Sequence, residues 1–111
     1  MKRLAILGST GSIGQSALSV VDAHPDRLSV VALAAGHNVN AMAEQVARYR
    51  PSMVAMASDA AAADVHQRLA APGPDVRGGA NALVAVASHP DADIVICASS
   101  GTAALEAVIV L

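Results

Sequence analysis

Short apolar runs alternate along this chain with segments in which apolar residues recur every three or four positions. The runs are no longer than strands and lack the polar and apolar alternation of a half-exposed sheet, which is typical of strands buried on both faces. The predicted strands are 4–7, 28–35, 53–56, a very short 76–77, and 93–97.

The segments between these runs have the helical period. Apolar positions after Ser12 recur at spacings of three and four until Pro25 stops them, and a second such pattern ends before Pro51. The predicted helices begin from Ser12 and after caps at Asn38 and Asp59, cover 80–88, and run from Thr102 to Leu111.

Strand and helix therefore alternate throughout, with no internal repeat or linker. Such alternation with buried strands predicts a parallel sheet joined by right-handed crossovers. We expect a single α/β domain over 1–111. Its fold would be a Rossmann-like, doubly wound parallel sheet of three layers (αβα), incomplete at the C-terminus because the last predicted helix still continues at Leu111.

Composition excludes several classes of function. A net charge of −2 and a single aromatic residue, Tyr49, provide neither a basic surface nor stacking partners for nucleic acid. The single cysteine, Cys97, cannot form an internal disulfide, and its apolar neighbours indicate a buried side chain. The first apolar run stops at Gly8, too early for a signal peptide, and no run is long enough to span a bilayer. We expect a cytoplasmic protein without nucleic-acid or membrane partners.

Residues arranged for catalysis or metal binding are absent from the sequence pattern. No two histidines have the i, i+4 spacing of a helical metal site, and Lys2 is the only lysine. A nucleophile elbow, a Walker motif and paired carboxylates are also missing. The sequence predicts no catalytic residue and no metal ligand in this chain.

Three glycines spaced GxxGxxG lie between the first predicted strand and the first predicted helix. Gly8 would permit a tight turn, Gly11 would let a pyrophosphate approach the backbone, and Gly14 would let the helix pack closely on the sheet. The N–H groups of 10–13, at the positive end of the helix, would bind the phosphates. This context favours a dinucleotide site over the alternative of a glycine-rich turn without a ligand.

The end of the second predicted strand bears on the choice of dinucleotide. Sites for NAD place Asp or Glu about 20 residues beyond the glycines, but 34–38 reads AAGHN. No carboxylate repels a 2′-phosphate there, and Asn38 with the N–H groups after Gly36 can donate to it, so NADP is favoured. One such hydrogen bond would give a roughly ten- to hundredfold preference. The alternative is that His37 and Asn38 are only a loop residue and a helix cap.

These motifs together resemble the N-terminus of the 1-deoxy-D-xylulose 5-phosphate reductoisomerase family. The resemblance is carried by KRLAILGSTGSIG at 2–14 and VVALAAGHNV at 30–39, and it continues through 93–101 to span the chain. It implies an NADPH-dependent enzyme of the non-mevalonate isoprenoid pathway, with a Rossmann domain first. Residues 1–111 would be part of that domain, and the catalytic and C-terminal domains would lie outside this chain.

The resemblance also implies roles for individual residues. The loop that holds the pyrophosphate matches Thr10, Gly11, Ser12 and Ile13. The segment around the adenosine 2′-phosphate matches Gly36, His37 and Asn38. Position 37 is commonly basic in the family, so the neutral histidine is a departure that weakens the expected phosphate contact. The loop 99–101 would lie near the nicotinamide.

The family's reaction rearranges a small phosphorylated sugar, 1-deoxy-D-xylulose 5-phosphate, to a branched aldehyde and reduces it to 2-C-methyl-D-erythritol 4-phosphate. Hydride comes from NADPH, and Mg²⁺ or Mn²⁺ acts as Lewis acid and template. The resemblance implies a homodimer whose metal ligands and substrate-phosphate site lie beyond Leu111. We expect these 111 residues alone to bind cofactor weakly and to catalyse nothing.

Two other functions remain open at this point. The chain could begin another NADP-dependent dehydrogenase, of the semialdehyde dehydrogenase type, which shares the first glycine loop but need not share the sequence at 35–38. It could also be a nucleotide-sensing domain without enzymatic activity, because fold alone does not fix function.

Overall fold

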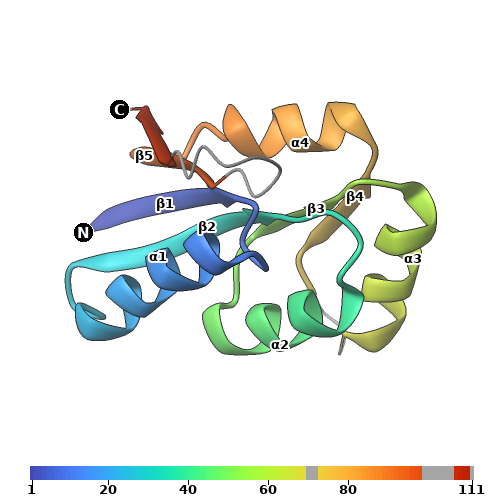
Figure 1. The fold of residues 1–111 in the computed structure, drawn as a ribbon, viewed down its shortest axis with the longest axis horizontal. Coiled ribbons are helices and arrows are strands. Elements are labelled where there is room, and N and C mark those ends of the chain that lie inside the picture. Colours follow the sequence, from blue (N-terminus) through green and yellow to red (C-terminus); the bar gives the residue numbers. More distant parts are fainter. Residues whose placement is uncertain (70–72, 99–106, 111) are drawn as a thin grey trace.

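A six-stranded sheet lies between two layers of helices in the computed structural model, which describes residues 1–69, 73–98 and 107–110 (Figure 1). The strands and helices are β1 (Lys2–Leu7), α1 (Ser12–Ala23), β2 (Leu28–Ala34), α2 (Val39–Tyr49), β3 (Met53–Met56), α3 (Asp59–Arg68), β4 (Asp75–Gly78), α4 (Ala80–Ala87), β5 (Ile94–Ala98) and β6 (Ala107–Val110).

The strand order is β4-β3-β2-β1-β5-β6, and strands β1 to β5 pair in parallel. β1 has β2 on one side and β5 on the other, so the direction in which strands are added reverses at β1. This arrangement confirms the predicted α/β, Rossmann-like, doubly wound fold. Ligands of such sheets bind outside the carboxyl ends of the strands at this reversal, where the glycine loop lies.

The two faces of the sheet have different cores. Helices α1, α2 and α3 cover one face of the sheet. The core between them and the strands contains large side chains, among which Ile6, Leu33 and Met42 are fully buried. Helix α4 covers the opposite face (Figure 1), where the buried side chains are mostly methyl groups. Small side chains on both surfaces let a helix approach a sheet closely, which gives the abundant alanines a structural role. The alanines of this second core are Ala5, Ala32, Ala34, Ala55 and Ala82.

Two local predictions were wrong. Residues 107–110, expected in a final helix, form β6, which pairs antiparallel with β5. The segment reads AVIV, and β-branched side chains favour strands, while a run this short does not distinguish the two periodicities. The remainder of that predicted helix lies outside the described residues. The cap of α3 is Ser58, whose Oγ accepts a hydrogen bond from Ala61 N at 3.2 Å, and Asp59 is the first helical residue.

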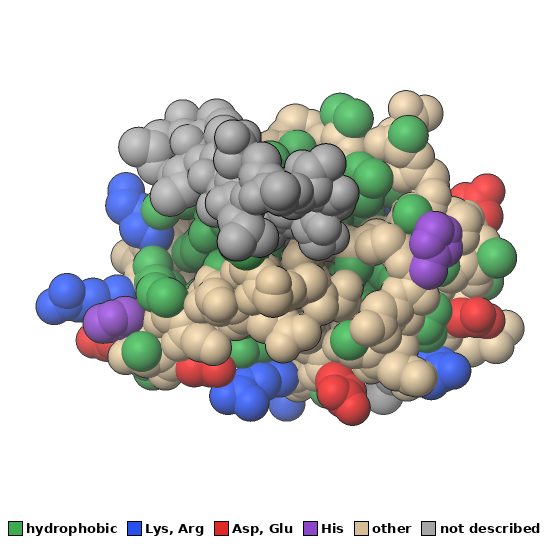
Figure 2. All heavy atoms as spheres, in the orientation of Figure 1, with side chains coloured by type: hydrophobic (Ala, Val, Ile, Leu, Met, Phe, Trp, Pro, Cys, Tyr) green, Lys and Arg blue, Asp and Glu red, His purple; other side chains and the backbone are tan. Residues whose placement is uncertain are grey.

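Charged side chains of both signs lie along the left, lower and right margins of the face shown in Figure 2. The ion pairs, including Arg3 with Asp93 and Arg48 with Asp22, join side chains that are at least one-third exposed. None of the helices within residues 1–69 and 73–98 has the length and apolarity needed to cross a membrane.

Candidate functional site

The two loops singled out from the sequence lie side by side. They follow β1 and β2, which are adjacent and parallel, so both loops emerge at the same edge of the sheet. Two backbone hydrogen bonds join the first loop to the end of β2, from Gly8 N and Ser9 N to Ala34 O, at 2.8 and 3.0 Å. Strand pairing and these backbone hydrogen bonds therefore bring residues 10–13 close to residues 36–38, with no contribution from side chains.

Gly8 and Gly14 have the structural roles predicted for them. Gly8 has a φ of 80°, in the region that favours glycine, and it turns the chain off β1. A Cβ on Gly14 would lie 2.1 Å from Gly8 O and 2.6 Å from Ser9 Cα. Both contacts involve backbone, which cannot swing aside as a long side chain can. Helix α1 packs on the loop as closely as it does only because position 14 has no side chain.

Helix α1 begins without a side-chain cap. Its N-cap is Gly11, whose N–H donates to Gly8 O at 3.1 Å, and the first helical bond runs from Gln15 N to Gly11 O at 2.9 Å. Across the part of the chain that the structure describes, the N–H groups of Thr10, Ser12 and Ile13 donate to no other backbone atom. These donors lie at the positive end of the helix dipole, where an anion is stabilised.

The neighbouring loop presents side chains instead. Asn38 caps α2, as the sequence predicted, through a hydrogen bond from Ala41 N to Asn38 Oδ1 at 3.1 Å. The Asn38 amide nitrogen donates to no residue that the structure describes, and His37 is exposed. Gly36 is also exposed, and a Cβ added to it would meet nothing within 4 Å. The loop is therefore accessible, and its glycine is not required by packing.

Two glutamines that sequence reasoning missed hold the glycine loop. Gln15 Nε2 donates to Thr10 O at 2.9 Å, and Gln45 Nε2 donates to Ser9 O at 2.9 Å. Gln45 comes from α2 and is 36 residues away from Ser9 in the sequence. Polar positions on predicted helices look like ordinary surface residues, so the sequence carries no signal for a contact at that separation.

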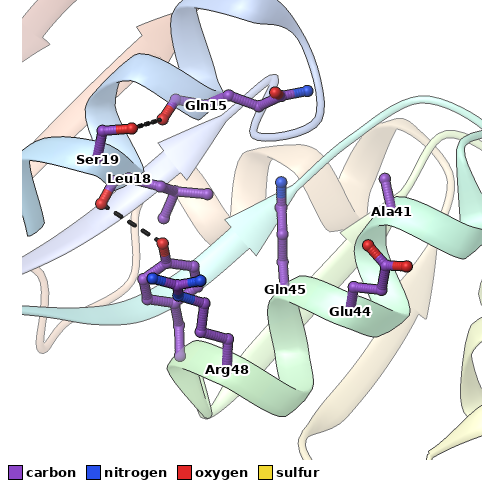
Figure 3. A pocket seen from close by; sticks show the side chains of 8 residues that line it. Gln15, Leu18, Ser19, Ala41, Glu44, Gln45 and Arg48 are labelled. Atoms are coloured by element: carbon purple, nitrogen blue, oxygen red, sulfur yellow. Dashed lines mark hydrogen bonds between the residues drawn. The ribbon is translucent and has the colours of Figure 1, made fainter. Parts of the chain in front are cut away.

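A cleft of about 440 Å³ separates α1 from α2. Figure 3 shows Gln45 pointing from α2 toward the loop at which α1 begins. At the other end of the cleft, Tyr49 Oη donates to Asp22 Oδ1 at 3.0 Å, and Arg48 pairs with Asp22 at 2.9 Å. Burial, together with the hydrogen bond to Asp22, raises the pKa of the Tyr49 hydroxyl. These polar contacts link α1 to α2 far from the glycine loop.

The remaining sequence predictions concern metals, Cys97 and the third loop. Among the residues that the structure describes, no group of three or more histidine, cysteine or acidic side chains could hold a metal ion. Cys97 is partly buried, less than the sequence predicted. The loop 99–101, expected near a nicotinamide, lies outside the described residues.

Comparisons with known proteins agree with this geometry. Residues 4–110 match the model of the 1-deoxy-D-xylulose 5-phosphate reductoisomerase family. The reductoisomerase of Anaeromyxobacter sp. (strain K) is 54% identical over 105 residues, which are 95% of this chain and 27% of that relative. The reductoisomerase of Geotalea uraniireducens is 45% identical over the same shares of the two chains.

Solved structures extend the similarity to the fold. A crystal structure of DOX-P reductoisomerase with magnesium matches with a TM-score of 0.80 and 30% identity, over 86% of this chain and 24% of that one. The Zymomonas mobilis reductoisomerase in complex with NADPH matches with a TM-score of 0.72 and 34% identity, over 78% and 23%. This chain spans 27% of the length of the curated relatives given above.

Proposed function

Because this chain belongs to the 1-deoxy-D-xylulose 5-phosphate reductoisomerase family, we propose that it forms the NADPH-binding part of such an enzyme. Residues 1–111 would be part of the first domain of a longer protein, since they correspond to 27% of a curated relative. The whole enzyme would rearrange and reduce 1-deoxy-D-xylulose 5-phosphate to 2-C-methyl-D-erythritol 4-phosphate in isoprenoid biosynthesis.

The observation that carries the proposal is the uncapped start of α1 at the reversal of strand order. Thr10, Ser12 and Ile13 have N–H groups that donate to no other backbone atom of the described residues, and these would bind the pyrophosphate. Gly11 would let the phosphates approach the backbone, and the hydroxyls of Thr10 and Ser12 can donate as well. An anionic pyrophosphate would supply the acceptors that this helix terminus lacks.

The adjacent loop would select NADPH over NADH. Gly36, His37 and Asn38 would surround the 2′-phosphate, with the Asn38 amide nitrogen as a donor and its oxygen retained as the cap of α2. Residues 34–38 contain no carboxylate that would repel the phosphate. A hydrogen bond to a charged group contributes about 1.5 to 3 kcal/mol, which favours NADPH by roughly tenfold or more.

The other partners of the enzyme would be bound outside these residues. NADPH, when bound, supplies the hydride that reduces the aldehyde. We assign no catalytic residue and no metal ligand to this chain. Mg²⁺ or Mn²⁺ and the phosphorylated sugar would be held by the rest of the protein, which would act as a cytoplasmic homodimer. A similar DOX-P reductoisomerase has been solved in complex with NADPH, fosmidomycin and magnesium.

A direct titration tests the proposal. The natural full-length protein is titrated with NADPH and with NADH at low salt, and the fluorescence of the reduced nicotinamide is followed. We expect saturable binding, with NADPH at least roughly tenfold tighter, and consumption of NADPH when 1-deoxy-D-xylulose 5-phosphate is added. A folded protein that binds neither dinucleotide would refute the proposal.

A further inference from the structure

We propose that Gln45 is a positioning residue of the dinucleotide site, which aims the Thr10 N–H at the pyrophosphate by holding the carbonyl of Ser9. The inference rests on the proposed function, and it adds a residue from α2 to a site otherwise built by the loop before α1. Figure 3 shows the Gln45 side chain directed at that loop from across the cleft.

Ser9 is held on both sides of its Cα. Its N–H donates to Ala34 O at 3.0 Å, and its carbonyl accepts from Gln45 Nε2 at 2.9 Å. The residue is fully buried, with none of its surface exposed. Because the N–H is tied to β2, the bond to Gln45 decides the direction of the following peptide.

The geometry of that peptide links Gln45 to the site. A trans peptide is planar, so the C=O of Ser9 and the N–H of Thr10 point in opposite directions. Fixing the carbonyl toward α2 therefore fixes the Thr10 N–H away from α2. That N–H donates to no other backbone atom of the described residues, so its orientation is free to serve a ligand.

The amide of Gln45 can face the loop in only one orientation. Gln45 Oε1 and Ser9 Oγ are buried and have no hydrogen-bond partner among the described residues. An apolar side chain at position 45 would remove the unpaired Oε1, but it would also leave the buried Ser9 carbonyl without its donor. Reversing the amide would point Oε1 at the Ser9 carbonyl, another acceptor, so the donor must face the loop. Gln45 therefore holds the Ser9 carbonyl in one direction, toward α2.

Gln15 provides a matched control. It makes a bond of the same type and length, from Nε2 to Thr10 O at 2.9 Å. That bond orients the next peptide, whose N–H belongs to Gly11 and already donates to Gly8 O at 3.1 Å. Gln15 therefore orients a peptide whose N–H is already used within the loop. Gln45 orients the peptide whose N–H, on Thr10, is available to a ligand.

The test compares Gln45→Met and Gln15→Met with the unchanged full-length protein. Dissociation constants for NADPH and NADH are measured by nicotinamide fluorescence, and folding is checked by thermal unfolding. For Gln45→Met we expect both constants to rise by roughly five- to tenfold at an unchanged ratio, because the pyrophosphate is common to both. For Gln15→Met we expect changes within about twofold.

Steady-state kinetics separates positioning from a general loss of structure. The KM for NADPH should rise in Gln45→Met by the same factor as the dissociation constant, while kcat and the KM for the sugar stay unchanged, as expected when uniform binding is lost. If Gln45→Met does not fold, Gln45→Glu keeps the shape and removes the donor, and the same readouts apply. Equal effects at positions 15 and 45, or none at 45, would overturn the inference alone. Failure of the unchanged protein to bind either dinucleotide would overturn the proposed function and this inference together.

Discussion

Helices α1 and α2 begin beside each other at one edge of the sheet, but their first turns are built differently. Helix α2 is capped by Asn38 Oδ1, at 3.1 Å from Ala41 N, whereas α1 starts at Gly11 with no side-chain cap. Losing such a cap costs a helix about 1 kcal/mol. Under the proposed function, α1 would offer backbone donors to the dinucleotide, while α2 satisfies part of its own backbone and would offer side chains.

The largest loss of stability should come from a side chain that prevents α1 from packing against the glycine loop. In Gly14→Ala the new Cβ would lie 2.1 Å from Gly8 O. Alanine favours a helix by up to about 1 kcal/mol over glycine, but the backbone clash should outweigh this and lower the free energy of unfolding by about 3 kcal/mol. Chemical denaturation measures the change.

Gly36→Ala is the matched control on the α2 side. Nothing lies within 4 Å of its added Cβ, so the free energy of unfolding should stay within about 1 kcal/mol of the original. If the two variants unfold at the same denaturant concentration, the close packing of α1 on its loop does not explain why position 14 is glycine.

Gly11→Val should abolish binding while the fold survives. Gly11 has a φ of −78° and a ψ of 173°, which any residue can adopt, so the valine meets no backbone strain. Its side chain would instead occupy the approach to the N–H groups of α1. We expect the affinity for NADPH and for NADH to fall by at least roughly hundredfold, measured by fluorescence titration. Retained affinity for either dinucleotide would show that the pyrophosphate does not bind at this loop.

Variants of Asn38 separate its two roles. Asn38→Ala removes both the cap and the amide donor, whereas Asn38→Ser keeps a cap and removes only the donor. Both should weaken NADPH relative to NADH by roughly tenfold, and only the alanine variant should lose about 1 kcal/mol of stability. Paired titrations and unfolding curves measure these effects. If NADPH and NADH lose affinity equally, Asn38 has no part in recognising the 2′-phosphate.

The smallest effect should come from the far end of the α1–α2 cleft. Burial and Asp22 raise the pKa of Tyr49 above its usual 10.0. A raised pKa in the folded state means that this contribution to stability is fully present below pH 10 and is lost as pH rises through the folded value. Tyr49 is the only tyrosine of residues 1–111, and the difference in ultraviolet absorbance between the full-length protein and its Tyr49→Phe variant during a pH titration isolates this group.

Tyr49→Phe tests the same contact without changing pH. It should lower the free energy of unfolding by about 1 kcal/mol and leave dinucleotide affinity unchanged, because Tyr49 contacts the end of α1 opposite to the glycine loop. A titration midpoint at or below the usual value, or a loss of affinity in the variant, would show that this contact is described wrongly.

The sequence predicts what depends on local chemistry. Buried apolar runs located β1, β2, β3 and β5, and the glycine spacing located the start of α1. Asn38 could be predicted as a cap because it precedes an amphipathic segment. Its hydrogen bond reaches only three residues along the chain, to Ala41 N. In each case the physical cause lies within a few positions of its effect.

Other features depend on residues far apart in the chain. The strand at 107–110 is stabilised by pairing with β5, which a short β-branched run does not reveal. The Gln45 bond joins residues 36 positions apart, and it exists only because α1 and α2 share a face of the sheet. The cap of α3 is Ser58, one position before the predicted Asp59. Helix boundaries commonly differ by one or two positions.

Amide hydrogen exchange tests most directly the claim that α1 and α2 serve different parts of one dinucleotide. Exchange is followed in the full-length protein at saturating NADPH, at saturating NADH and without ligand. Both dinucleotides should protect residues 10–14 to the same extent, and NADPH should protect 36–41 more than NADH does. Unchanged exchange at 10–14 under saturating NADPH would contradict the claim that the uncapped start of α1 binds the pyrophosphate.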